Sequence, residues 1–300
     1  VKNLMSIIKG GHYEAIHVHT DFQGGVVAFA AFLARVKIRI CHSHCTSWNR
    51  GEHGIQALGL KALKGMIQVF ANQYCACSQE AGHFLFGENS KKLHILHNAV
   101  HVGNYQSLGK VNRQAERKKL GIHPDNLIIG HVGRFSESKN QVFILKLVQH
   151  LRQQGVKATA ILVGDGPLKQ TVEIEAERLG ISESILFPGI RSDIPYWMHL
   201  FDVFAFPSLF EGFGIAALEA QCAGTSCVVS DRVPVAVDTG LGLLTYLKLE
   251  EPIQKWADAI IESAAIPKPN LSEIHKHFLR NGFDIENSVK QWEKLYMRTG

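Results

Sequence analysis

The sequence lacks any long apolar run that would span a bilayer. No stretch of eighteen or more apolar residues occurs in the 300 residues, and the start, VKNLMSIIKGGHYEAIHVH, lacks the apolar core and cleavage site of a secretory signal. Charge of either sign is modest, since 32 Lys and Arg stand against 27 Asp and Glu. We therefore expect a cytoplasmic protein whose partners are anionic small molecules or an acidic membrane surface, with no nucleic acid.

Cysteine is scarce and shows no pairing motif. Six cysteines lie inside apolar segments without a CxxC pair: Cys41, Cys45, Cys75, Cys77, Cys222 and Cys227. This pattern predicts reduced, mostly buried thiols, in keeping with a cytoplasmic location. With 46% hydrophobic and 20% charged residues, the chain suits one large or two ordinary globular domains.

Short β-rich runs alternate with helical stretches, which is typical of parallel α/β sheets. The runs are almost continuously apolar, as in strands that helices cover on both faces. The expected strands are Ala15–His19, Lys37–His42, Tyr74–Cys77, Leu127–Val132, Ala158–Val163, Val203–Phe206 and Ser226–Val229. The pattern weakens after Ser230, where the expected helices are Glu251–Ala265, Leu271–Asn281 and Asp284–Met297.

A polar stretch at Tyr105–Asn126 separates two strand–helix series, so the expected domain junction falls near Tyr105–Val111. The predicted fold is α/β, with two doubly wound, Rossmann-like domains of parallel strands. Their expected limits are residues 1–108, completed by the tail helix at 284–300, and residues 109–283.

A cationic, glycine-containing turn follows the strand LIIGHV. Gly133 lets this turn approach a ligand, and Arg134 and Lys139 bring two positive charges to the carboxyl end of a strand, where open α/β sheets bind ligands. A guanidinium fork and a lysine charge suit a diphosphate. The alternative is a solvated loop with two surface cations.

A second turn joins a strand to a helix within FPSLFEGFGIAALEA, residues 206–220. A helix that begins near Phe213 or Gly214 exposes backbone N–H groups, which bind phosphate. Glu211 precedes this helix and Glu219 lies in its second turn, so one carboxylate can accept from a ribose diol and the other from a sugar hydroxyl. Taken alone, two such glutamates are as often solvated surface charges.

Two more loops repeat this arrangement, GDGP at 164–167 and FPGIRSD at 187–193. Pro167 stands at a favourable first helical position. The order and spacing of the four motifs predict that their loops converge on one edge of a sheet.

In this order, GRFSESKN, GDGPL, FPGIRSD and SLFEGFGIAALEA resemble family 4 retaining glycosyltransferases, which have the GT-B fold and generally need no metal. The match covers nearly the whole chain and is strongest from Ile128 to Val229. It implies a nucleotide-diphosphate sugar as co-substrate, with UDP favoured over GDP, and no cofactor. The implied donor-binding residues are Gly133, Arg134, Lys139, Gly164, Arg191, Glu211, Gly212, Phe213, Gly214, Ile215 and Glu219.

The resemblance also implies individual roles. Arg134 and Lys139 hold the diphosphate and Glu211 lies beside the donor sugar, so that these three are expected to be catalytic together with His19. Glu219 binds the ribose, and Arg191 or its backbone lies near the base. His19, which ends the HVH strand, would hydrogen-bond the sugar or polarise the reacting centre. The alternative for His19 is a histidine that caps the strand for packing.

The HSH segment with His42 and His44, and the loop of Asn98, resemble the acceptor side of exopolysaccharide and capsule transferases. In those transferases the corresponding loop usually has the sequence Asn-Gly. Here Asn98 is present and Ala99 takes the place of the glycine. A zinc site made of Cys41, His42, His44 and Cys45 is the alternative for the HSH segment, and it is disfavoured because neighbours along a strand point to opposite faces. No metal site is therefore expected.

The resemblance predicts an incomplete amino-terminal domain, because the HVH strand arrives by residue 17, ahead of which the family has a strand and a glycine-rich loop. The predicted function is retaining hexosyl transfer to a polysaccharide or lipid-linked saccharide in exopolysaccharide, capsule or cell-envelope synthesis. The alternative is a catalytically impaired sugar-nucleotide-binding or partner subunit. An epimerase of similar fold is disfavoured by the motif that runs from Glu211 to Glu219.

A helix expected at Ile55–Phe70 carries Lys61 and Lys64 among apolar residues. This composition suggests peripheral docking at the inner face of the cell membrane or on an acceptor lipid. A buried helix with a basic rim is the alternative.

Overall fold

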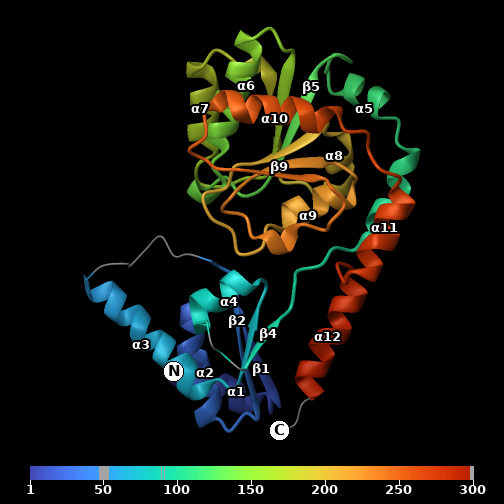
Figure 1. The fold of residues 1–300 in the computed structure, drawn as a ribbon. Coiled ribbons are helices and arrows are strands. Elements are labelled where there is room, and N and C mark those ends of the chain that lie inside the picture. Colours follow the sequence, from blue (N-terminus) through green and yellow to red (C-terminus); the bar gives the residue numbers. More distant parts are fainter. Residues whose placement is uncertain (47–53, 89, 91, 298–300) are drawn as a thin grey trace. The chain divides into compact units, whose positions relative to one another are not determined.

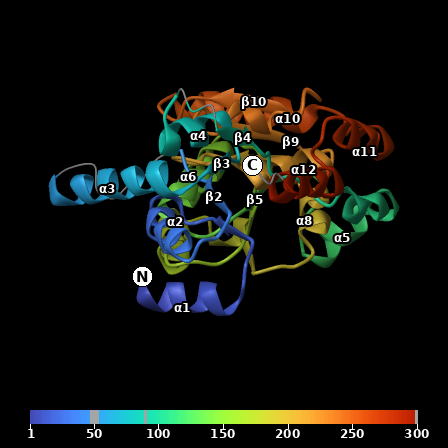
Figure 2. The same cartoon turned by 90° about the horizontal axis from the view of Figure 1, so that it is seen from below.

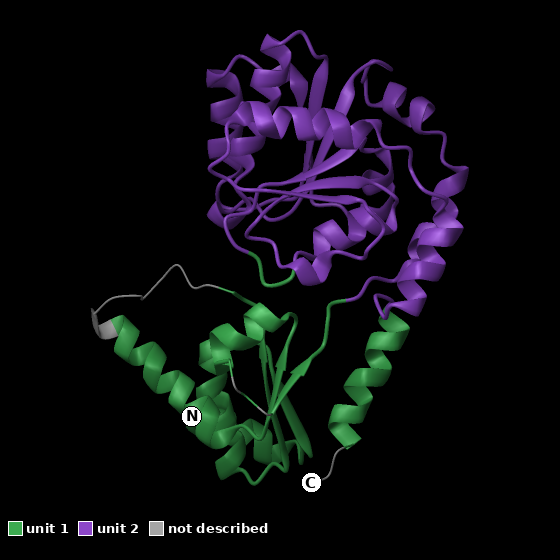
Figure 3. Cartoon of the chain, viewed as in Figure 1, with its two compact units in different colours: residues 1–98, 211–213, 285–300 green, residues 99–210, 214–284 purple. Residues whose placement is uncertain are grey.

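The computed structural model describes residues 1–46, 54–88, 90 and 92–297. The chain forms two compact units (Figure 3): residues 1–98 with 211–213 and 285–300, and residues 99–210 with 214–284. The sequence placed the limits at residues 108 and 283. Residues 99–108 group with the second unit because the 3-10 segment Val102–Lys110 packs on helices α8 (Ile194–Leu200) and α11 (Leu271–Arg280) and buries Tyr105.

The first unit contains a parallel sheet with strand order β1–β2–β3–β4 (Figure 1). Its strands are β1 (Ala15–Val18), β2 (Ile38–Ser43), β3 (Gln73–Ala76) and β4 (Leu93–Ile95). Its described helices are α1 (Lys2–Gly10), α2 (Gly24–Leu33), α3 (Gly54–Phe70), α4 (Gln79–Phe86) and α12 (Ile285–Met297). The fold class predicted for this part is therefore confirmed.

Helices cover both faces of this first sheet, as Figure 2 shows from below. On one face, Cys41 and Tyr74 pack into a core with Ile67 of α3 and Leu85 of α4. On the other face, the strand residues Ile38, Ile40 and Cys75 pack against Trp292 and Leu295 of α12. The tail helix therefore belongs to the core of the first unit.

The second unit contains a six-stranded parallel sheet with strand order β10–β9–β8–β5–β6–β7. Its strands are β5 (Leu127–Val132), β6 (Ala158–Val163), β7 (Ile185–Gly189), β8 (Val203–Phe206), β9 (Ser226–Ser230) and β10 (Leu244–Leu247). Its helices are α5 (Arg113–Lys119), α6 (Gln141–Gln153), α7 (Lys169–Arg178), α8 (Ile194–Leu200), α9 (Ile215–Cys222), α10 (Ile253–Ala265) and α11 (Leu271–Arg280). The sheet is the one expected of a doubly wound domain.

The expected strands recur in the structure with shifts of at most one residue at their ends, and the three tail helices with shifts of at most two. Strands β4, β7 and β10 were not among those expected. In β10 all four residues are half-buried at the edge of the sheet, so the strand lacks the continuous apolar run that marks central strands. Within the described residues no helix is both long and apolar enough to cross a bilayer.

The thiols are as the sequence predicted. Among the described residues no disulfide is formed, and all of the cysteines but the half-buried Cys45 are buried. Burial raises the pKa of the Cys41 thiol to about 12, so it stays protonated at neutral pH.

Gly130 in β5 provides a test of packing in the second unit. A Cβ at this position would lie 1.9 Å from Cδ2 of Phe201, so Gly130→Ala forces the fully buried phenyl ring to move. We expect the substitution to lower the free energy of unfolding by about 1–3 kcal/mol, measured by chemical denaturation.

Gly65→Ala in α3 is the matched control, because a Cβ there meets no heavy atom within 4 Å. Alanine in a helix interior is expected to stabilise the chain by about 0.5–1 kcal/mol. Equal effects of the two substitutions would contradict the packing argument.

Candidate functional site

The centre of the second sheet holds a topological switch point. From β5 the chain proceeds to β6 and β7 on one side, and then crosses to β8 and β9 on the other side. Open α/β sheets bind ligands at the carboxyl ends of the two strands where this reversal occurs. Gly133 directly follows β5, and Ser208 follows β8, so both predicted motifs lie at the switch point.

Backbone hydrogen bonds tie the loops after β5, β6 and β7 together. The Gly133 amide donates to the Val163 carbonyl at 3.0 Å, and the Phe135 amide donates to the Asp165 carbonyl at 2.9 Å. The Gly164 amide in turn donates to the Gly189 carbonyl at 2.9 Å. The predicted convergence of these loops on one sheet edge is thus present.

The contact between the loops after β5 and β6 requires a glycine at position 164. Gly164 has a φ of +133°, and a Cβ there would lie 2.1 Å from the Gly133 carbonyl oxygen. No other residue type fits, because both the backbone conformation and the space exclude a side chain. Two glycines that the sequence assigned to donor binding therefore lie against each other.

Lys139 lies beside Gly133. A Cβ on Gly133 would be 3.5 Å from Cδ and Cε of Lys139, so the lysine stem runs along the exposed backbone. The ammonium nitrogen lies 4.7 Å from the ring centroid of Phe206, the last residue of β8. Arg134 follows Gly133 and is exposed. Both cations therefore lie at the carboxyl end of β5.

The loop after β8 is fixed to this cationic loop. The Leu209 amide donates to the Ser138 carbonyl at 2.8 Å, and Asn140 Nδ2 donates to the Pro207 carbonyl at 3.1 Å. Asn140 itself adopts a left-handed conformation with φ of 53°. The two loops of the switch point thus form one hydrogen-bonded structure.

Helix α9 begins at Ile215, one residue after the expected start, with Gly214 as its cap at φ +91°. Its first amide groups have no partner within the helix, which makes its amino terminus suitable for an anion. Glu219 lies in the second turn and is half-buried, and burial raises the pKa of its carboxyl to about 7. Glu219 therefore changes charge close to neutral pH.

The turn between β8 and α9 divides between the two units (Figure 3). Glu211, Gly212 and Phe213 group with the first unit, whereas Gly214 and Ile215 belong to the second. Phe213 is buried, and Glu211 and Gly212 are half-buried. The boundary between the two units therefore differs here from the predicted limit, which placed all five residues in the second domain.

Arg191 follows β7 and is exposed. Its Nε and second terminal nitrogen donate to the two carboxylate oxygens of Asp193, each at 2.9 Å. The guanidinium also lies 5.6 Å from the ring centroid of Trp197 in α8. The side chain that the sequence assigned to the nucleotide base is thus held by a neighbouring carboxylate.

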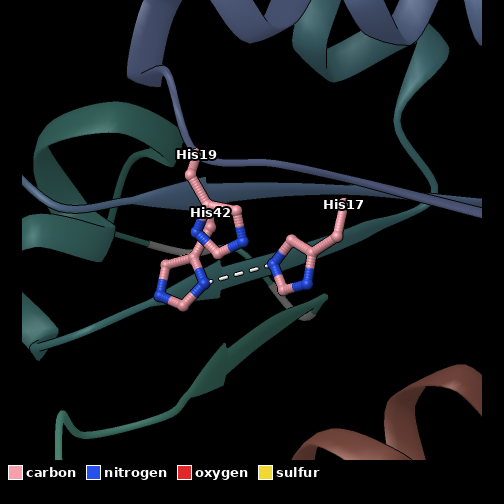
Figure 4. Close-up of side chains that lie close together, drawn as sticks. All are labelled: His17, His19 and His42. Atoms are coloured by element: carbon pink, nitrogen blue, oxygen red, sulfur yellow. Dashed lines mark hydrogen bonds between the residues drawn. The ribbon is translucent and has the colours of Figure 1, made fainter.

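Four histidines of the first unit lie where β1 and β2 end, and Figure 4 shows three of them, His17, His19 and His42. In the parallel register His17 pairs with Ile40, and Val18 with Cys41, so the four, with His44, share one face. His17 was not among the predicted site residues. It lies two residues before His19, and this spacing along a strand places both side chains on one face.

Two hydrogen bonds connect these imidazoles in pairs. His17 Nε2 lies 3.2 Å from His42 Nδ1, and His19 Nδ1 lies 2.8 Å from His44 Nε2. Burial, followed by the neighbouring imidazoles, lowers the pKa of His17 to about 3 and that of His42 to about 2. Both rings are therefore neutral at pH 7.

Of the other residues assigned to the acceptor side or to zinc, Asn98 and Cys41 lie apart from this face. Asn98 follows β4, two strands away from β2. The thiol of Cys41 points to the opposite face, where its sulfur donates to the Gly24 carbonyl at 3.8 Å. Cys41 and His42 therefore cannot bind one zinc ion, because neighbours along a strand point to opposite faces of the sheet.

Comparison with known proteins identifies the family. The family Glycosyl transferases group 1 matches residues 112–262, just over half of the chain. The putative glycosyltransferase EpsF of Bacillus subtilis (strain 168) is 41% identical over 300 residues, which cover 99% of this chain and 78% of that protein. The UDP-Gal:alpha-D-GlcNAc-diphosphoundecaprenol alpha-1,3-galactosyltransferase of Escherichia coli is 24% identical, over 98% of this chain and 78% of that enzyme.

Among solved structures, Anabaena Alr3699/HepE in complex with UDP has a TM-score of 0.78 at 24% identity, covering 98% of this chain and 80% of that one. The two parallel α/β sheets thus match the GT-B fold of glycosyltransferases. On the family match and the identity to EpsF, the chain belongs to the glycosyl transferases group 1 family and is a glycosyltransferase.

Proposed function

We propose that this glycosyltransferase transfers a hexosyl unit from a UDP-sugar to a polysaccharide or lipid-linked saccharide, with retention of anomeric configuration and without a metal ion. The observation that supports a diphosphate donor is the cationic loop after β5, where Lys139 lies along the Gly133 backbone. In support of UDP, HepE has been solved with UDP-glucose. The name of the Escherichia coli relative specifies UDP-Gal and a diphosphoundecaprenol-linked acceptor.

In this proposal the two cations perform the main electrostatic work. Arg134 and Lys139 bind the donor diphosphate and stabilise the negative charge that develops as it leaves. Fixed charges at a preformed loop need no reorganisation during the reaction. The acceptor hydroxyl attacks on the face from which the diphosphate departs, with a phosphate oxygen as its base, so no protein nucleophile is required.

The remaining residues recognise the two substrates. Glu219 accepts from the ribose hydroxyls, the amides at the start of α9 contact the phosphate and sugar, and the backbone beside Arg191 contacts the base. His19 and Glu211 hydrogen-bond the donor sugar. The acceptor side consists of His42, His44 and Asn98.

We further propose that the protein works in the cytoplasm, at the inner face of the cell membrane where a lipid-linked acceptor is found. Leu58 and Val69 of α3 are 70% and 71% exposed, and Lys61 is exposed between them. Lys64 instead donates to the Phe84 carbonyl at 3.2 Å. Flotation with anionic liposomes is the test, and absence from the floated fraction would exclude this docking.

Arg134→Ala tests the diphosphate site. Hydrogen bonds to charged groups contribute about 1.5–3 kcal/mol, so we expect the Kd for UDP to rise by roughly 10- to 100-fold in calorimetry. Arg152→Ala is the control, because it removes an exposed arginine from the last turn of α6, away from the carboxyl ends of the strands. Unchanged UDP affinity in Arg134→Ala would refute the assignment.

Glu219→Gln tests the ribose contact through pH. The carboxylate is the better acceptor, and because its pKa is raised to about 7, UDP affinity in the unmodified protein should increase from pH 6 to pH 8. UDP itself gains charge in this range, so the variant is compared with the unmodified protein at each pH. We expect a weaker affinity and a flatter profile in Glu219→Gln, and identical profiles would contradict the role.

An assay for released UDP separates transfer from binding alone. Released UDP with a UDP-sugar and a saccharide acceptor is expected of an active transferase. UDP binding without release, across a panel of UDP-sugars, would instead favour an impaired sugar-nucleotide-binding or partner subunit.

A further inference from the structure

The histidines on β1 and β2 form a compact cluster of nitrogen ligands in the first unit. One ring nitrogen from each of His17, His19 and His42 lies within 4.8 Å of the other two (Figure 4). His17 and His42 lie in the adjacent parallel strands β1 and β2, so the sheet fixes their backbones, and His19 directly follows β1. No carboxylate or thiol belongs to this set.

We propose that His17, His19 and His42 together bind one divalent transition-metal ion, with zinc favoured. Neutral imidazole is a good ligand for zinc, and three protein ligands leave the fourth position of a tetrahedral ion for solvent. The ion lies in the first unit, whereas Arg134 and Lys139 of the proposed diphosphate site follow β5 in the second. His19 and His42 also have roles in the proposed function, but metal binding is measured without donor or acceptor, so each proposal can fail alone.

The spacing of the first two ligands fits such an ion. His17 Nε2 and His42 Nδ1 are 3.2 Å apart. Two nitrogens that each lie about 2.0–2.1 Å from one tetrahedral zinc are themselves about 3.3 Å apart. The pair is therefore already at the separation that a shared metal requires, without movement of either strand.

Neighbouring groups can fix the ring nitrogens that face the metal. Tyr296 Oη of α12 lies 2.8 Å from His17 Nδ1 and can accept its N–H, which leaves the Nε2 lone pair for the ion. His44 Nε2 can likewise accept from His19 Nδ1 at 2.8 Å. A partner on the second ring nitrogen is the usual support for a metal-bound histidine.

His42 is the most buried member of the cluster. Its side chain is 1% exposed, and its Nε2 is among the buried polar atoms of the described residues that have no hydrogen-bond partner. With an ion bound at Nδ1, the ring proton of His42 lies on Nε2, and the metal takes the place of the hydrogen bond to His17. Trp292 of α12 covers the rings, with its centroid 5.0 Å from that of His17 and 5.4 Å from that of His42.

A carboxylate beside the cluster also favours a cation there. Asp21 accepts from the His44 amide at 3.0 Å.

The test uses the full chain without a histidine tag, stripped with chelator and freed of it by gel filtration. Co²⁺ is added and the visible absorption of tetrahedral cobalt is followed, and Zn²⁺ is then measured by calorimetry and by displacement of Co²⁺. We expect one equivalent of each ion to bind, with loss of the cobalt bands on addition of zinc.

Substitutions assign the ligands. His17→Asn and His42→Asn should each weaken Co²⁺ and Zn²⁺ binding by at least about tenfold, the lower bound for loss of supporting residues at metal sites. His12→Asn is the matched control, because it removes an exposed histidine outside the cluster at a φ of 49°, a conformation that asparagine tolerates. Its metal affinity should equal that of the unmodified protein.

Circular dichroism establishes that each variant is folded. If the histidine variants unfold, Tyr296→Phe tests the metal site instead. This variant keeps the aromatic ring of residue 296 on α12 and removes only the hydroxyl that contacts His17. We expect about tenfold weaker metal binding for this variant. The proposal is overturned if the stripped protein binds no Co²⁺ or Zn²⁺, or if folded His17→Asn, His42→Asn or Tyr296→Phe binds them as tightly as the unmodified protein.

Discussion

Parallel pairing of the strands is the constraint on which the functional residues of both units depend. In a parallel sheet all strands end at the same edge, so a residue that follows one strand comes close to residues that follow its neighbours. In the second unit this brings Gly133 and Gly164 into direct backbone contact, and places Lys139 beside the end of β8. In the first unit it aligns two pairs of histidines on a common face.

The two units use the same architecture for different chemistry. The second unit presents cations and backbone amides at its switch point, which suits an anionic donor. The first unit presents neutral imidazoles, whose pKa values are lowered mainly by burial. Buried neutral rings accept and donate hydrogen bonds or bind a metal, but they do not attract a diphosphate by charge. This contrast supports the proposal that donor binding depends mainly on the second unit.

Much of the fold and part of the candidate site followed from the sequence. Central strands such as β6 are buried along their whole length, so a continuous apolar run marked them, whereas the half-buried edge strand β10 gave no such signal. The glycine and lysine of the cationic loop were found because strand, glycine and charge occur in succession. His17 was missed because it lies inside a strand, where a histidine is easily taken for a packing residue.

The sequence by itself determined the α/β class, the succession of strands and the loops that carry charge, because apolar runs and glycine turns are local properties of the chain. Only the tertiary structure decided which residues meet. Strand register placed His17 beside His42, and removed Cys41 to the opposite face. Packing of α12 brought Tyr296 to His17 across 279 residues of sequence. Such contacts depend on which strands pair and which helix covers them, and local sequence patterns do not encode that choice directly.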